Sequence, residues 1–209
     1  LKNVNLKLGV DILEFCITYF LISFLNENLT LKQKSHILGI KSSITMTVVG
    51  ILFNYNFFVN TNVNVNDILA NFGISSIIFF NSYLLCDLFF GYVFYPKYMN
   101  LLSGYIHHII YIFINFIVLY TNNYNVYLIN MISEIPTVIL NIGTYNNKYR
   151  SDILFGTSFF FLRIVYHIYL MYYFKEIGYL LFFISTPALI LHIYWFATWV
   201  KKYGSKLLN

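Results

Sequence analysis

Long apolar stretches without a single charged residue alternate with short polar segments along the chain. Four of these stretches cover residues 42–66, 68–86, 98–133 and 177–200, which makes them 25, 19, 36 and 24 residues long. A helix that crosses a lipid bilayer needs about 20 consecutive, predominantly apolar residues, and buried helices of soluble proteins seldom run as long without a charge. The pattern therefore predicts a polytopic membrane protein.

The same pattern predicts seven transmembrane helices joined by short connections rich in Asn, Tyr and Lys. No connection is long enough to separate two domains. We therefore expect an all-α integral membrane bundle of about seven helices around a polar cavity. The expected spans are residues 6–25, 38–59, 68–95, 102–120, 126–143, 152–174 and 177–199.

Composition supports this class of protein and excludes others. Hydrophobic residues make up 59% of the 209 residues and charged residues only 10%, whereas a soluble domain carries about 25% charged residues. The net charge of +5 comes from Lys and Arg scattered between apolar blocks, so we expect no nucleic-acid partner. Cys16 and Cys86 fall inside apolar stretches, where we expect packing residues rather than a disulfide or a metal site.

The positions of Lys and Arg predict the orientation, because cytosolic loops keep an excess of both. With seven spans, the count is nine basic residues on one side of the membrane and three on the other, which predicts a lumenal N-terminus and a cytosolic C-terminus. The sequon that starts at Asn28 then lies on the cytosolic side and should stay unglycosylated. The nine residues are Lys32, Lys34, Lys41, Lys97, Lys148, Arg150, Lys201, Lys202 and Lys206, and the three are Lys2, Lys7 and Lys175.

Six ionisable side chains fall inside the spans at similar depths. Such residues cost about 2.5–3.5 kcal/mol each at the centre of a membrane helix, and they are functional candidates by default. At a rise of about 1.5 Å per residue, all six lie roughly 8–16 Å below the cytosolic ends of their helices. We expect them to turn inward and to form a polar chamber that opens toward the cytosol. They are Asp87, His107, His108, Glu134, Arg163 and His192.

These residues also have structural explanations. Arg163 could form an ion pair with Asp87 or with Glu134. His192, beside Trp195, fits an interfacial or hydrogen-bonding role as well as a site. We expect no metal site, because adjacent histidines on a helix point about 100° apart, whereas metal-binding pairs favour i, i+4 spacing.

Two prolines interrupt expected spans. Pro136 and Pro187 each remove a backbone hydrogen bond and should kink or break their helices. Glu134, Thr137 and Asn141 share one helical face next to the first proline. We expect that face to line the chamber, or to form structural hydrogen bonds between helices.

A family resemblance rests on four segments. They are Tyr83 followed by Asp87 late in a long span, the pair His107-His108 early in the next, the run Glu134-Ile135-Pro136-Thr137 leading to Asn141, and Phe159 to Arg163 followed by His192 to Trp195. In this order and spacing they resemble the TLC-domain family of multi-spanning membrane proteins, which includes ceramide synthases and non-synthase lipid-homeostasis proteins.

The resemblance implies a helical bundle with an interior cavity, usually in the endoplasmic reticulum, that acts on lipids or senses them. It divides the chain into an N-terminal helix and loop (1–34), a TLC domain (35–203) and a basic tail (204–209). In ceramide synthases the paired histidines and an aspartate-rich segment belong to an acyl-CoA-dependent N-acyltransferase site. His107 and His108 match the pair, but residues 128–134 lack paired aspartates, so the chain is closer to the non-synthase branch.

Three functions remain as hypotheses. The first is binding or organising membrane lipids in the cavity. The second is an acyltransferase with acyl-CoA as co-substrate and no other cofactor, in which His107 or His108 acts as a base or acyl carrier beside Asp87. The third is a proton or ion pathway. The residues expected to bind lipid are Tyr83, Glu134, Thr137, Asn141, Arg163, His192 and Trp195.

Overall fold

The computed structural model describes residues 2–60, 67–177 and 179–207, and every regular element in this part of the chain is helical. Seven helical segments are long and apolar enough to cross a membrane, which confirms the predicted all-α membrane bundle. They are Val4–Leu25, Leu31–Val59, Asp67–Val93, Leu101–Tyr120, Tyr124–Tyr145, Asp152–Tyr173 and Phe182–Tyr203.

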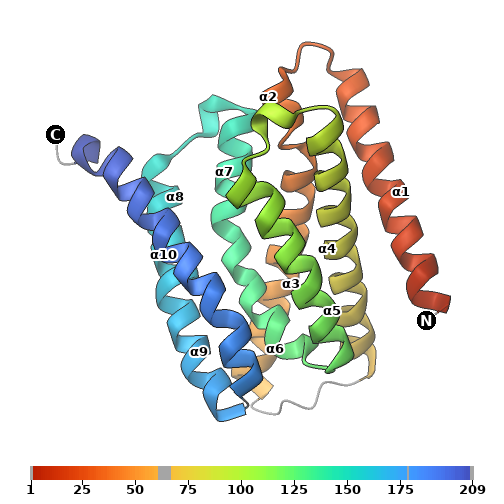
Figure 1. Cartoon of the computed structure of the whole chain (residues 1–209), viewed down its shortest axis with the longest axis vertical. Helices are drawn as coiled ribbons and strands as arrows, with labels where there is room; N and C mark the ends of the chain where they lie inside the picture. The colour runs from red at the N-terminus through yellow and green to blue at the C-terminus, as the bar shows by residue number, and fades with distance from the viewer. Residues whose placement is uncertain (1, 61–66, 178, 208–209) are drawn as a thin grey trace.

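Several spans are built from more than one helical element (Figure 1). The elements in chain order are α1 (Lys2–Leu25), α2 (Leu31–Lys34), α3 (Ile37–Asn60), α4 (Asp67–Val93), η1 (Pro96–Tyr98), η2 (Leu101–Ile106), α5 (His107–Tyr120), α6 (Tyr124–Ile129), η3 (Asn130–Glu134), α7 (Ile135–Tyr145), η4 (Asn147–Tyr149), α8 (Asp152–Phe159), η5 (Phe160–Val165), α9 (Tyr166–Ile177) and α10 (Tyr179–Leu207).

Polar side chains start the helices at one end of the bundle. Thr30 caps α2 in a capping box with Gln33, Asn100 accepts hydrogen bonds from the first backbone amides of η2, and Ser151 caps α8. These caps satisfy amide groups that a helix leaves without intrahelical partners. The three helices therefore begin at defined residues at the same end of the molecule.

The outer helices α1 and α10 pack on the bundle differently. α1 lies mainly against α4, where the rings of Tyr19 and Phe90 stack with centroids 4.5 Å apart. α10 lies mainly against α9, α8 and η5. Between them, α3 contacts η3, α7, α4 and α6, and its buried residues Met46, Val49 and Phe53 belong to the main apolar core.

The two prolines have different effects. Pro136 stands in the first turn of α7, directly after the 3₁₀ segment η3, so the fifth span is broken there as expected. α10 continues through Pro187 as one helix.

The two ends of the bundle carry different charge. The α1–α2 and α7–α8 connections and the C-terminal part of α10 lie at one end, and the N-terminus lies at the other (Figure 1). Lys41 is not a loop residue as the orientation count assumes, because it lies within α3, whereas Lys32 and Lys34 lie in the short helix α2 that precedes it. Without it, eight basic residues against three still favour the same orientation.

Candidate functional site

Asp87 and His108 form a buried pair between α4 and α5. Oδ2 of Asp87 lies 3.3 Å from Nε2 of His108. The Tyr95 hydroxyl donates a hydrogen bond of 2.9 Å to Oδ1 of Asp87. Nδ1 of His108 donates to the carbonyl oxygen of Gly104, 2.6 Å away. The structure thus brings together two of the three predicted catalytic residues, and it adds Tyr95, which the sequence pattern did not single out.

This geometry restricts what His108 can do. Both ring nitrogens face oxygen acceptors, so either both carry protons or Asp87 is the protonated partner. Neither nitrogen then offers a free lone pair. Burial raises the pKa of the Tyr95 phenol, and the neighbouring carboxylate adds to the shift, so Tyr95 remains a donor to Asp87. His108 is therefore held by its hydrogen bond to Gly104 and its close contact with Asp87 rather than left free as a base or nucleophile.

A second buried group surrounds Arg163. Its Nη2 lies 3.1 Å from Oε1 of Glu134 and 2.7 Å from the hydroxyl oxygen of Thr137. Nε donates to the carbonyl oxygen of Ser133 at 2.9 Å. The guanidinium carbon also lies 5.4 Å from the centre of the Phe159 ring. Of the two ion pairs that the sequence allowed, the structure has Arg163 with Glu134.

Irregular helix turns accompany both groups. The π-helical segment η2 ends directly before His107, and the π-helical segment η5 contains Arg163. A π-turn leaves backbone carbonyls without their usual helical partner and is frequent at functional sites. The Arg163 carbonyl accepts a hydrogen bond of 3.1 Å from Nδ1 of His192. This explains why His192 points into the bundle and is only 2% exposed.

His107 differs from His108 in having a free ring nitrogen. Its ring lies between Tyr111 and Trp195, with centroid distances of 4.4 and 5.3 Å. Nδ1 is buried and has no hydrogen-bond partner in the described part of the chain. The contact with Trp195 connects α5 to α10, two helices whose main packing partners are different. His107 thus places an unpartnered polar atom where two parts of the bundle meet.

His167 is a buried polar residue that the sequence analysis did not include in the site. Its ring lies 5.4 Å from that of His192, and the side chain is 1% exposed. The backbone of Ser185 is nearby, yet neither ring nitrogen forms a hydrogen bond with a described residue. The sequence does carry a signal for it, because His167 stands four residues after Arg163 and therefore on the same helical face.

Two predicted residues lie beside these groups rather than inside them. Tyr83 places its ring 5.8 Å from that of His108. Asn141 does not contact Arg163, because its Oδ1 accepts a hydrogen bond of 2.7 Å from Nδ1 of His36. His36 stands at the start of α3, and it could be predicted only with knowledge that α3 packs against α7.

A cavity of about 80 Å³ lies at the basic end of the bundle, between α7, α8 and α10. Arg150 stands at its rim, bonded to Asp152 and to the Tyr203 hydroxyl. None of the interior polar residues predicted for the site lines this cavity. The residues that line the cavity include Gly143, Arg150, Asp152, Phe155, Trp199 and Tyr203.

No family model, curated protein or solved structure matches the chain. Among the residues that the structure describes, no three His, Cys, Asp or Glu side chains are grouped so that they could hold a metal ion. The function therefore has to be inferred from the geometry of the polar interior.

Proposed function

We propose that the chain is a membrane protein of lipid homeostasis, similar to non-synthase TLC-domain proteins, that binds lipid at its polar interior. The observation that supports this most is His107, whose Nδ1 is buried without a partner in the described part of the chain, between Tyr111 and Trp195. A buried polar atom without a hydrogen bond is costly, by about 1–3 kcal/mol. A lipid whose headgroup carries a hydroxyl or an amide would satisfy it.

The partnered groups favour binding over chemistry. Asp87 and His108 hold each other, and Arg163 is neutralised by Glu134. Paired charges of this kind give a polar wall without a free base or a free positive charge. The lipid-facing surfaces next to His107 are aromatic and aliphatic, which suits an acyl chain.

We place this protein in the endoplasmic reticulum by the same family resemblance, with the polar interior in the cytosolic half of the membrane.

Retention of lipid by the purified protein tests this function. The variant His107→Phe keeps the ring packing but removes both nitrogens, and Phe113→Leu is a matched control on a lipid-facing position of α5. Loss of one hydrogen bond of about 1.4 kcal/mol corresponds to roughly tenfold weaker binding. We expect native mass spectrometry from nanodiscs to show a polar lipid class depleted about tenfold in His107→Phe and unchanged in the control. Equal lipid content in both variants and the wild type would refute the proposal.

An acyltransferase is the second candidate, because His107 has the free nitrogen that His108 lacks. In this case Nδ1 of His107 would take the proton of an amine as that amine attacks the acyl-CoA thioester, and the CoA thiolate would leave. Labelled acyl-CoA with candidate amines should then give an amide product that disappears in His107→Phe. Absence of product with the wild-type protein would leave lipid binding as the function.

A further inference from the structure

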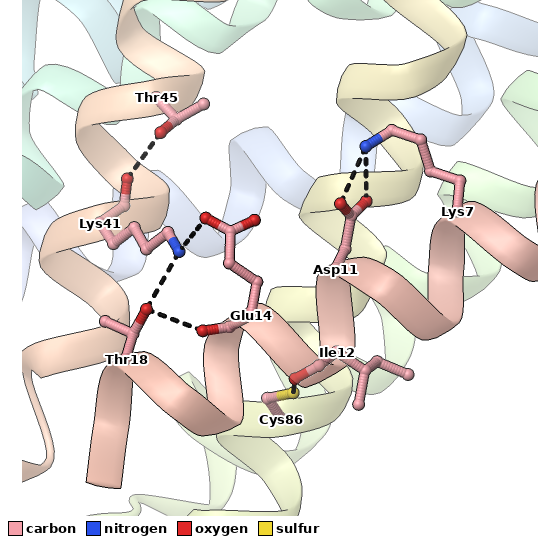
Figure 2. Close-up of polar contacts among 8 residues, drawn as sticks. All are labelled: Lys7, Asp11, Ile12, Glu14, Thr18, Lys41, Thr45 and Cys86. Carbon is pink, nitrogen blue, oxygen red and sulfur yellow. Dashed lines mark hydrogen bonds and ion pairs between the residues drawn. The ribbon is translucent and has the colours of Figure 1, made fainter. Parts of the chain in front are cut away.

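Glu14 and Lys41 form an ion pair on the outer surface of the bundle, between α1 and α3. Nζ of Lys41 lies 2.6 Å from Oε1 of Glu14 and 3.1 Å from the Thr18 hydroxyl, as Figure 2 shows. The Glu14 side chain is 55% exposed and that of Lys41 24%. The pair is therefore connected within the chain but open on its outer side.

The depth of this pair makes its exposure unusual. Glu14 stands near the middle of the span Val4–Leu25, about 15 Å from either end at 1.5 Å per residue. Charged residues at the centre of a membrane normally face the interior of a bundle or a water-filled cavity. At this depth the open side of the pair would face acyl chains unless another polar surface covers it.

Glu14 belongs to a polar stripe on α1. Lys7, Asp11, Glu14 and Thr18 follow each other at intervals of four, three and four residues, which places them on one helical face. Lys7 and Asp11 form their own ion pair of 2.8 Å along this stripe (Figure 2). Its members Glu14 and Thr18 lie toward α3, where the contact between helices is smaller than that of α1 with α4.

We propose that this surface binds a second copy of the chain, with Glu14 of each copy next to Lys41 of the other. A two-fold axis normal to the membrane keeps every residue at its own depth, so it can pair only groups that lie at equal depth. Glu14 and Lys41 satisfy this condition because they already contact each other. The surface carries both signs of charge side by side, as a self-complementary interface of this symmetry requires.

Other occupants fit the charges less well. A lipid phosphate lies at the membrane surface rather than at the centre, and it would meet the Glu14 carboxylate together with the Lys41 ammonium group. A purely apolar helix would bury the pair without completing its hydrogen bonds. A second copy supplies an ammonium group for each carboxylate and a carboxylate for each ammonium group.

Charge reversal tests the contact between copies. Glu14→Lys and Lys41→Glu each place like charges on one surface, so each variant alone should lose dimerisation by at least about tenfold in affinity, the effect of roughly 1.4 kcal/mol. When the two variants are mixed, a lysine of one copy meets a glutamate of the other at both contacts, and dimerisation should return. We would measure energy transfer between two dye-labelled populations in proteoliposomes at a fixed protein-to-lipid ratio. Glu27→Lys, at an exposed position in the loop after α1, is the control and should not change the signal.

The mixture of the two variants is decisive because each variant alone has like charges at positions 14 and 41, so copies of one variant cannot form the ion pair with each other. A wild-type protein that stays monomeric, or a mixture that associates no better than its components, would overturn the proposal. If the reversal variants fail to insert, the combined neutral variant Glu14→Gln, Lys41→Gln gives the same reading: loss of dimer supports the interface and retention overturns it. Lipid retention through His107 is unaffected by these changes, so the proposed function stands or falls separately.

Discussion

At the scale of single residues, the two interior ion pairs differ in the kind of cation they hold. An arginine guanidinium is effectively always charged in a protein, so the buried charge of Arg163 is compensated by Glu134, Thr137 and a backbone carbonyl. A histidine side chain, by contrast, also exists as a neutral imidazole that keeps one N–H donor. The two buried pairs should therefore respond differently to the loss of their carboxylates.

Glu134→Gln should be the more harmful of two matched substitutions. It leaves a buried guanidinium without a counter-charge, which costs about 3–5 kcal/mol when one partner of a buried pair is removed. Asp87→Asn leaves an imidazole that can become neutral and still bond to the amide, so we expect a loss of about 1–2 kcal/mol. Thermal unfolding in detergent should give a clearly larger decrease in midpoint for Glu134→Gln. Equal decreases would mean that Arg163 does not depend on Glu134.

At the scale of elements, close approach of backbones fixes how the broken fifth span lies against α3. A Cβ atom at Gly50 would overlap the backbone of Met131 and Ile132 in η3. Asn54, one turn further along α3, donates to the carbonyl oxygen of Ile129 at 2.6 Å. Gly50 and Asn54 together hold α3 against the α6–η3 junction, and η3 then leads directly into α7. The position of the Arg163 group, which bonds to this turn, therefore depends on a glycine in α3.

Gly50→Ala and Gly9→Ala should have opposite effects. At Gly50 the added methyl group meets backbone that cannot move without separating α3 from η3, so we expect a loss of at least about 2 kcal/mol, at the upper end of about 1–3 kcal/mol for overpacking. At Gly9 nothing lies within 4 Å of an added Cβ, and alanine should stabilise α1 by about 0.5–1 kcal/mol. Unfolding in mixed micelles measures the change in the free energy of unfolding for both variants. A Gly50→Ala variant with unchanged stability would show that α3 and η3 are not in tight contact at this position.

At the scale of the whole molecule, seven candidate spans leave the two described ends of the chain at opposite ends of the bundle (Figure 1). The helix α2, which contains Lys32, and the α7–α8 connection, which contains Lys148 and Arg150, lie at the same end of the bundle (Figure 1). The cavity with Arg150 and Tyr203 lies at this end too. By the positive-inside rule, we expect this end to face the cytosol together with its loops and its cavity.

Labelling of single cysteines tests the orientation. In a background with Cys16→Ala and Cys86→Ala, we would place one cysteine at Asn123 and another at Lys148, in connections at opposite ends of the bundle. A membrane-impermeant maleimide added to sealed, cytosol-side-out microsomes should label Lys148→Cys at once and Asn123→Cys only after permeabilisation. The reverse pattern would place the N-terminus in the cytosol.

The linear sequence was enough to predict the seven spans and six ionisable side chains of the interior, but it did not single out Tyr95, His36 or His167. Both follow from local properties: the length of apolar stretches and the cost of a charge in lipid act on each segment regardless of its neighbours. Pro136 likewise marked a helix break because its missing amide is a property of the residue itself.

Partners were decided only by the three-dimensional packing. Arg163 bonds to Glu134 rather than Asp87, Asn141 to His36, and Lys41 to a helix that precedes it. Each of these pairings depends on which helix faces are adjacent, and Arg163 in addition lies in a π-helical segment. Hydrogen bonds require atoms to meet within about 3 Å, a precision that depth along separate helices does not provide.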